Sequence, residues 1–232
     1  MKSIPSGEIT AVLEAFLREK SDTPTSRRRE RSWDFCFNHF QDNTRPTEVM
    51  DLSCLHLGYY LASWGMMRGS SFLFHHTNAM HYQRVVEVVE QHNDQMRGFD
   101  VPDYLDSDRK QVLDAAWADL SSALLPEGGQ SLTLVSKVMM GVWGCVPSFD
   151  TYFRSTFRIL GETTAERRAF NQVGADALRH LSEFYYQHAD EVETVRCRFR
   201  TWDMNTGQPT RRSMTRAKVL DVYGFQTSFV SR

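Results

Sequence analysis

The chain has 232 residues, 41% of them hydrophobic and 24% charged, and its formal net charge is −2. These values are ordinary for a globular protein with a substantial core, and they exclude both wholesale disorder and an overall polyanion-binding character. The longest apolar run, around Leu57 to Met67, is broken by Gly58, Ser63 and Gly65 and is far shorter than the roughly 20 residues that span a bilayer. We therefore expect a water-soluble protein with no membrane partner.

The first residues and the cysteines indicate a cytoplasmic location. Glu8 and Glu14 stand within the apolar periodicity of the N-terminal segment, which is typical of a helix and not of a signal peptide. Four cysteines are scattered along the chain without CxxC spacing: Cys36, Cys54, Cys145 and Cys197. This distribution predicts neither a disulfide framework nor a zinc site, so we expect a reduced protein.

The first half of the chain has the periodicity of amphipathic helices. In chain order, the expected helices cover residues 7–20, an aromatic-rich stretch around 33–40, residues 47–67 and residues 71–92. Ser6 is available to cap the first of them, and Arg45-Pro46 ends the second.

The second half continues the helical pattern after a connector at residues 99–107. Further helices are expected over residues 108–124, closed by Pro126 and Gly128-Gly129, over 131–143, in a short segment from Ser148, over about 165–190, and after a cap at Thr215. No repeat or change of composition divides the chain. We predict an all-α fold, a single multi-helix domain over residues 1–232 with a small basic β-hairpin or irregular segment near its C-terminus.

That C-terminal segment concentrates positive charge. Between residues 196 and 218 one acid, Asp203, stands among seven basic residues: Arg196, Arg198, Arg200, Arg211, Arg212, Arg216 and Lys218. A second basic cluster, RRRER, covers residues 27–31. Alternating basic and apolar residues from 196 to 200, followed by the turn sequence NTGQP at 205–209, predict the hairpin. The segment is either a phosphate-binding face or a solvated surface strand.

The most unusual stretch is 131–157, because Lys137 stands in the middle of an apolar helix. A buried ammonium without a partner costs several kcal/mol or loses its proton. Lys137 therefore reaches the surface, pairs with an acid or takes part in chemistry. Pro147 starts the next helix, and Asp150 lies in its first turn, where exposed N–H groups stabilise a carboxylate. A lysine and a carboxylate on helices joined by a tight turn can meet at one cleft.

The residues of this stretch, Ser136-Lys137 followed by a Gly/Cys turn and VPSFDTYF at 146–153, resemble a motif in a bacterial family of uncharacterised helical proteins. An upstream element of that family, WGM…RG, is similar to residues 64–69. The family in turn resembles the helix-hairpin-helix DNA glycosylases, in particular the 8-oxoguanine glycosylase fold. The resemblance covers about 35 residues. This chain lacks a full glycine-rich hairpin before Asp150, and its Lys–Asp separation of 13 residues is shorter than in those enzymes.

The resemblance implies a protein that acts on or recognises a modified base in DNA or RNA. Lys137 would attack the sugar carbon C1′, and Asp150 would stabilise developing positive charge or orient a nucleophile. Trp64 or Trp143 would stack on an extruded base. Arg68, between two glycines, would point inward or at an anion. The basic segment, together with the RRRER cluster at 27–31, would hold phosphates through Arg196, Arg198, Arg200, Arg211 and Arg212.

Two alternatives remain open at this point. Arg68 and His75 have the spacing of the catalytic pair of HEPN ribonuclease toxins, and they would lie on nearly one face of a continuous helix. Alternatively, Lys137, Asp150 and Arg68 form a buried polar network in a non-enzymatic interaction module. His75, His76 and His81 show no ligand spacing with a carboxylate, and no phosphate-binding glycine loop is present, so we expect neither a metal nor a cofactor. The sequence does not determine the oligomeric state.

Overall fold

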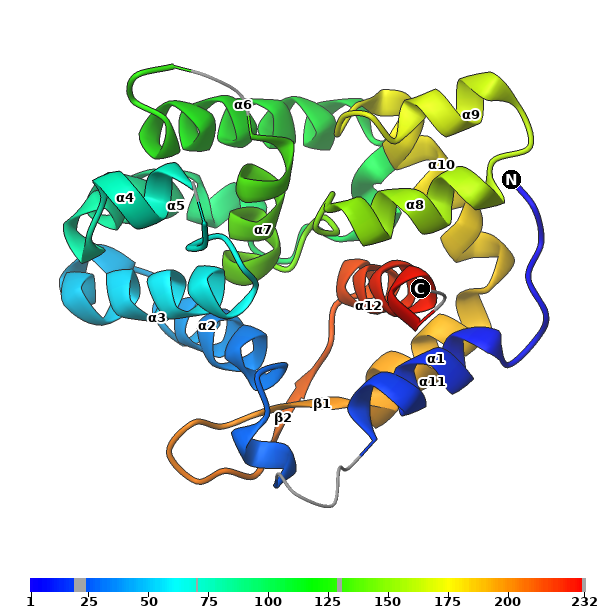
Figure 1. The fold of residues 1–232 in the computed structure, drawn as a ribbon, viewed down its shortest axis with the longest axis horizontal. Helices are drawn as coiled ribbons and strands as arrows, with labels where there is room; N and C mark the ends of the chain where they lie inside the picture. Colours follow the sequence, from blue (N-terminus) through cyan, green and yellow to red (C-terminus); the bar gives the residue numbers. More distant parts are fainter. Residues whose placement is uncertain (19–23, 70, 129–130, 231–232) are drawn as a thin grey trace.

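The chain folds almost entirely into α-helices in the computed structural model, which describes residues 1–18, 24–69, 71–128 and 131–230 (Figure 1). The helices are α1 (Glu8–Leu17), α2 (Arg31–Asp42), α3 (Met50–Ser63), α4 (Phe72–His76), α5 (Gln83–Met96), α6 (Ser107–Leu124), α7 (Leu132–Val142), α8 (Thr151–Leu160), α9 (Thr164–Ala169), α10 (Ala175–Gln187), α11 (Ala189–Arg198) and α12 (Arg216–Val230). Short 3-10 helices cover Thr25–Arg27, Pro46–Val49, Ala79–Tyr82 and Val101–Leu105. The strands are β1 (Arg200–Trp202) and β2 (Pro209–Ser213), so the all-α prediction is confirmed.

The predicted C-terminal hairpin is present. Strand β1 pairs antiparallel with β2, and Arg200 lies opposite Ser213. Asp203 closes the turn, because its carboxylate accepts the backbone N–H groups of Asn205 and Thr206. The hairpin lies beside α2 and below α12 in Figure 1.

Two long predicted helices are broken into shorter ones. The helix expected over 71–92 divides into α4, a 3-10 turn and α5, because the side chain of Asn78 accepts a backbone N–H and starts a new turn. The helix expected over 165–190 divides into α9, α10 and α11, with Gly174 preceding α10. Helix α11 continues to Arg198, so residues 196–198 of the alternating stretch belong to a helix and not to a strand.

Of the two predicted N-terminal caps, Ser6 and Thr215, only one is present in the structure. Helix α1 begins after Gly7, which has a φ of 85°, and no side chain caps it, so the predicted role of Ser6 is wrong. Thr215 does cap α12, because its hydroxyl accepts the N–H of Lys218 at 3.1 Å. Residues 19–20 of the first predicted helix and Gly129 lie outside the described residues.

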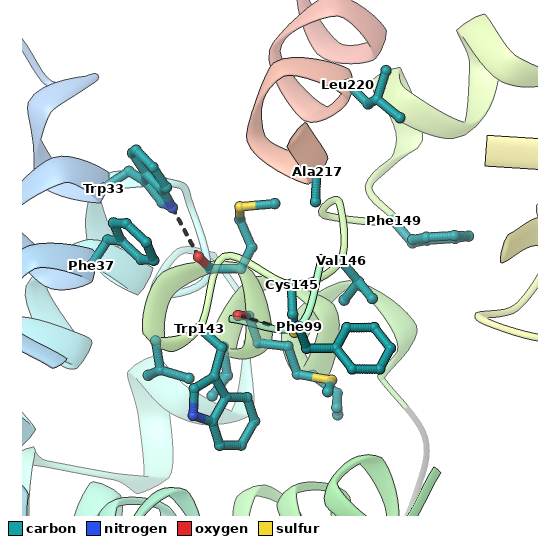
Figure 2. Close-up of a cluster of buried hydrophobic side chains, with 14 of the residues drawn as sticks. Trp33, Phe37, Phe99, Trp143, Cys145, Val146, Phe149, Ala217 and Leu220 are labelled. Atoms are coloured by element: carbon teal, nitrogen blue, oxygen red, sulfur yellow. Dashed lines mark hydrogen bonds between the residues drawn. The ribbon is translucent and has the colours of Figure 1, made fainter. Parts of the chain in front are cut away.

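Helix α7 occupies the centre of the fold, in contact with α2, α3 and α6 (Figure 1). Residues 134–142 are all buried, as expected for a helix that is apolar on every side. Trp33 donates its indole N–H to the carbonyl of Met140 at 2.9 Å (Figure 2). Gly141 allows the ring of Tyr60 to approach, since a Cβ at this position would lie 2.5 Å from it. No helix of the described ranges is long and apolar enough to cross a membrane.

Candidate functional site

Lys137 and Asp150 lie beside each other. Lys137 is in the middle of α7 and is 4% exposed, and its Nζ lies 3.4 Å from Oδ2 of Asp150. Asp150 is the N-cap of α8 and not a residue of its first turn, because Oδ1 accepts the backbone N–H groups of Tyr152 and Phe153, both at 3.0 Å. One carboxylate oxygen is thus fixed by the helix start, and the other faces the ammonium.

The segment between the two helices is fixed by long-range contacts. Gly144 reverses the chain with a φ of 65°, and a Cβ at this position would lie 2.8 Å from a methyl of Thr215. The N–H of Phe149 donates to Oγ of Ser136 at 2.9 Å, which ties the segment to α7. The N–H of Ser148 donates to Asp221 of α12 at 2.8 Å. These bonds hold the residues before α8 alongside α7 and place Asp150 next to Lys137.

Both side chains line an open cleft of about 860 Å³. The ends of α3 and α12 and the starts of α4, α7 and α8 contribute to its walls. The aromatic side chains that line it are Trp64, Phe72, Tyr152, Phe225 and Phe229. The cleft therefore combines one buried ion pair with several aromatic surfaces, a combination of apolar and polar lining that is typical of small-molecule pockets.

Trp64 forms a wall of this cleft. Its ring lies nearly parallel to that of Phe16 at 6.4 Å and meets the edge of Phe225 at 5.6 Å. The charged groups of Arg29, Lys137 and Lys218 lie 5.0, 5.5 and 5.6 Å from the ring centroids. Because these groups already surround the indole, Trp64 separates the cleft from the interior and offers little free ring face for stacking.

A second lysine–aspartate pair lies behind Trp64, and the sequence reasoning missed it. Lys218 and Asp221, both buried in α12, form an ion pair at 2.8 Å. They line an inner cavity of about 10 Å³ that Lys137 and Asp150 also line. This volume holds about one water molecule at most. The sequence feature that pointed to Lys137 is also present at Lys218, because Lys218 and Asp221 are charged residues within the otherwise apolar helical stretch 217–223.

Tyr60 lines the same inner cavity from α3. Burial, followed by the nearby charge of Asp221, raises the pKa of its phenol well above the usual value. The hydroxyl therefore stays protonated at neutral pH and can act only as a neutral hydrogen-bonding group next to the two ion pairs.

Trp143 is placed differently from the prediction. Its ring is 2% exposed, and its indole N–H donates to the side chain of Asn93 at 3.0 Å. Figure 2 shows it within the buried cluster around α7. Trp143 does not line the cleft of Lys137 and Asp150, so as placed here it cannot stack on a ligand there. The physical reason is that the chain turns at Gly144 and directs Trp143 into the core.

The arginines of the basic segment also lie away from the cleft. Most of them are engaged within the protein: Arg196 with Glu193, Arg198 with Glu14, Arg200 with Ser213 and Arg212 with Asp42. Arg211 is exposed on β2. Acidic residues of α1, α2 and α11 therefore neutralise most of the positive charge that is concentrated in this segment of the sequence. The segment is not a continuous phosphate-binding face.

Arg68 lines the cleft, but it does not share a helix with His75. Gly65 and Gly69 have φ values of 76° and 54°, which end α3 and form a turn around Arg68. His75 follows in α4, and its ring bonds the carbonyl of Gly69 at 2.7 Å. The continuous helical face expected for the ribonuclease alternative is absent.

Comparisons of the chain with protein-family models, curated protein sequences and solved structures find no match. Within the described ranges, no group of three or more His, Cys, Asp or Glu side chains is arranged to hold a metal ion. The resemblance to glycosylases therefore stays a prediction, and a functional assignment depends on the residues that line the cleft.

Proposed function

We propose that this protein is a DNA glycosylase-like nucleic-acid-binding protein that takes a modified base into the cleft of Lys137 and Asp150. The observation that carries the proposal is the contact of these two side chains at an aromatic-lined cleft of about 860 Å³. A volume of this size lies within the range of ligand pockets, about 300–1,000 Å³, and accommodates a nucleotide. A purely structural ion pair does not require such a cleft beside it.

The base would stack on the aromatic side chains at the α8–α12 side of the cleft. Phe229 is 49% exposed, and its ring lies 5.3 Å from Phe225 and 5.5 Å from Tyr152. Base–aromatic stacking contributes about 1–3 kcal/mol per base and tolerates any base. An enzyme that acts on a base must first remove it from the stack, and such a surface offsets part of that cost.

The proposed reaction begins with proton transfer from Lys137 to Oδ2 of Asp150. The free amine attacks C1′, the N–C1′ bond forms, and the C1′–base bond breaks with its electron pair left on the base nitrogen. Asp150 returns the proton to the departing base. The ring oxygen O4′ then takes a proton from the attached nitrogen as the C1′–O4′ bond opens, which leaves an iminium link between Lys137 and the sugar. Water hydrolyses this link and regenerates the lysine.

A cytoplasmic location belongs to the same proposal. The four cysteines are free, and Cys36, Cys54 and Cys145 are buried. Unpaired cysteines are common where the cell keeps thiols reduced, and DNA or RNA is accessible in that compartment.

The test is an excision and trapping assay on single- and double-stranded oligonucleotides that carry damaged or modified bases. Borohydride reduces an iminium link to a stable covalent complex, so we expect trapped wild-type protein and no trapping with Lys137→Ala. Asp150→Asn should lose at least about 100-fold in excision rate, the lower end of the range for loss of an acid–base group. Lys110→Ala, which removes a lysine paired with Asp114 on α6, is the matched control and should react as wild type does. The proposal fails if wild-type protein neither binds nor cuts any substrate at low salt, or if Lys137→Ala is trapped equally well.

Two substitutions of Asp150 distinguish its role in the proposed reaction from its role as the N-cap of α8. Both Asp150→Asn and Asp150→Ala leave Lys137 without its acid, but Asp150→Asn retains an oxygen that accepts the N–H groups of Tyr152 and Phe153, whereas Asp150→Ala also loses the cap. We expect Asp150→Ala to be less stable than Asp150→Asn by about 1 kcal/mol, the usual worth of an N-cap. Urea unfolding monitored by circular dichroism measures this difference. Equal unfolding midpoints would show that the cap does not stabilise α8.

A further inference from the structure

The cleft has a charge opposite to that of the whole chain. Its described lining includes three cations, Arg29, Arg68 and Lys137, and one acid, Asp150. Lys137 and Asp150 neutralise each other at 3.4 Å, which leaves the two arginines as the excess charge. A positively charged cleft in a protein of net charge −2 attracts anions to that cleft specifically.

The two arginines lie beside Trp64 and Gly65, and one of them precedes these residues in the sequence while the other follows them. Arg29 precedes α2, and its guanidinium lies 5.0 Å from the ring of Trp64. Arg68 follows α3, and the turn between Gly65 and Gly69 folds its side chain back, so that a Cβ at Gly65 would lie 3.4 Å from its Nε. Both side chains therefore lie beside the Trp64–Gly65 wall of the cleft.

Neither guanidinium has an ion-pair partner among the residues that the structure describes. Glu30, the acid next to Arg29 in sequence, pairs instead with Arg28 at 2.9 Å. This differs from the basic segment, where Arg198 and Arg212 pair with acids. An exposed arginine without an acid, beside an aromatic cleft, is suited to bidentate binding of a phosphate.

We propose that Arg29 and Arg68 bind the backbone phosphate of the nucleotide whose base enters the cleft. This inference rests on the proposed function and deepens it, because it assigns the substrate as a phosphodiester-linked nucleotide and moves phosphate binding away from the hairpin. The base lies against Phe225 and Phe229, the sugar faces Lys137, and the phosphate lies at the Trp64–Gly65 wall.

The experiment measures binding and excision separately. Fluorescence anisotropy follows the binding of a labelled single-stranded 12-nucleotide oligothymidylate to wild type, Arg29→Gln, Arg68→Gln and the double variant, over a range of salt concentrations. Charged hydrogen bonds contribute about 1.5–3 kcal/mol each, so we expect each single variant to bind about 10- to 100-fold more weakly. In the double variant, the slope of the logarithm of affinity against the logarithm of salt concentration should also be smaller in magnitude by about 0.7, the value for one phosphate contact with a single strand.

Two controls keep the result specific. Arg198→Gln removes an exposed arginine that pairs with Glu14 and should bind as wild type does. A neutral methylphosphonate version of the oligonucleotide should bind wild type more weakly and should not distinguish wild type from the double variant. Urea unfolding confirms that the variants fold, as expected for two exposed side chains.

The outcomes separate this inference from the proposed function. Weaker binding by the arginine variants supports the inference even if no substrate is excised, and in that case only the glycosylase chemistry fails. Excision by wild type with unchanged binding in both arginine variants overturns the inference alone. Equal losses in Arg198→Gln and the arginine variants also overturn it, and absence of any binding by wild type at low salt overturns both.

Discussion

At the scale of single residues, Trp64 is where the charges of the site meet. A cation over an indole ring contributes about 0.5–2 kcal/mol, more when the contact is shielded from water, and three cations share this ring. Lys137 and Lys218 also have their own aspartates, so each buried ammonium is stabilised by a carboxylate and by a ring. This explains how two buried lysines are tolerated near an apolar core.

The criterion of a misplaced charge identified Lys137 from the sequence, and with it the acid of its pair. The same criterion applied to Lys218 would have found the second pair, but the excess of neighbouring basic residues made Lys218 look like part of a surface segment. This criterion does not select Arg29, because nothing in the sequence distinguishes one arginine of RRRER from the next. Only the fold shows that Arg29 is the one that lies over Trp64.

His39 gives a pH-dependent prediction at this scale. Burial, with a smaller contribution from His56, whose ring stacks at 4.3 Å, lowers the pKa of His39 from 6.5 to about 4. The unfolded chain therefore binds a proton near pH 6.5 and the folded protein only near pH 4. The stability that this residue contributes is fully present above pH 6.5 and is lost as the pH falls towards 4.

We expect His39→Gln, which cannot titrate, to lose less stability than wild type over this range. The difference in the free energy of unfolding between the two proteins should change by roughly 1–3 kcal/mol between pH 7 and pH 4. Urea denaturation at half-unit pH steps measures it. Parallel stability profiles for the two proteins would contradict the stated pKa shift.

At the scale of elements, helix α7 determines the geometry of the site. Its apolar sides contact α2, α3 and α6, and these contacts fix the position from which Lys137 projects. The segment 145–150 returns along the same helix and ends at the N-cap of α8. A shift of α7 relative to α8 would therefore separate Lys137 from Asp150.

Gly141→Ala tests this packing. Alanine favours a helix, but its Cβ would lie 2.5 Å and 2.8 Å from two ring carbons of Tyr60. We expect a loss of about 1–3 kcal/mol, because overpacking of a core forces side chains and backbone to move. Ser122→Ala, at an exposed position of α6, is the matched control and should change stability by less than about 0.5 kcal/mol. Thermal and urea unfolding measure both, and a neutral Gly141→Ala would show that Tyr60 can move without cost.

At the scale of the whole molecule, one buried carboxylate connects distant parts of the chain. Asp100, before the 3-10 helix Val101–Leu105, accepts the N–H of Arg216 at 2.8 Å and that of Ala217 at 2.9 Å at the start of α12. Arg216 also bonds Glu193 of α11 at 2.6 Å. Asp100 thus fixes the orientation of α12, which supplies Asp221, Phe225 and Phe229 to the site.

Replacement of this residue should affect the entire fold. Asp100→Ala leaves two N–H groups at the start of α12 without their acceptor and should lower the free energy of unfolding by about 3–5 kcal/mol. Asp100→Asn keeps one accepting oxygen and should be intermediate. The expected result is a single cooperative urea transition at a lower midpoint, measured by circular dichroism and by tryptophan fluorescence. Separate transitions by the two probes would show that α12 is not part of one cooperative unit.

The sequence by itself determined the helical class, the positions of most helices and the hairpin, because helical periodicity, caps and turn residues act within a few residues of each other. It also predicted that Lys137 needs a partner, since the cost of a buried charge does not depend on the fold. Only the tertiary structure decided which residues share the cleft. The bond from Ser148 to Asp221 spans 73 residues and that from Arg198 to Glu14 spans 184. Contacts at such separations depend on how the helices pack, so they alone placed Arg29 at the cleft, turned Trp143 into the core and compensated most of the charge of the basic segment.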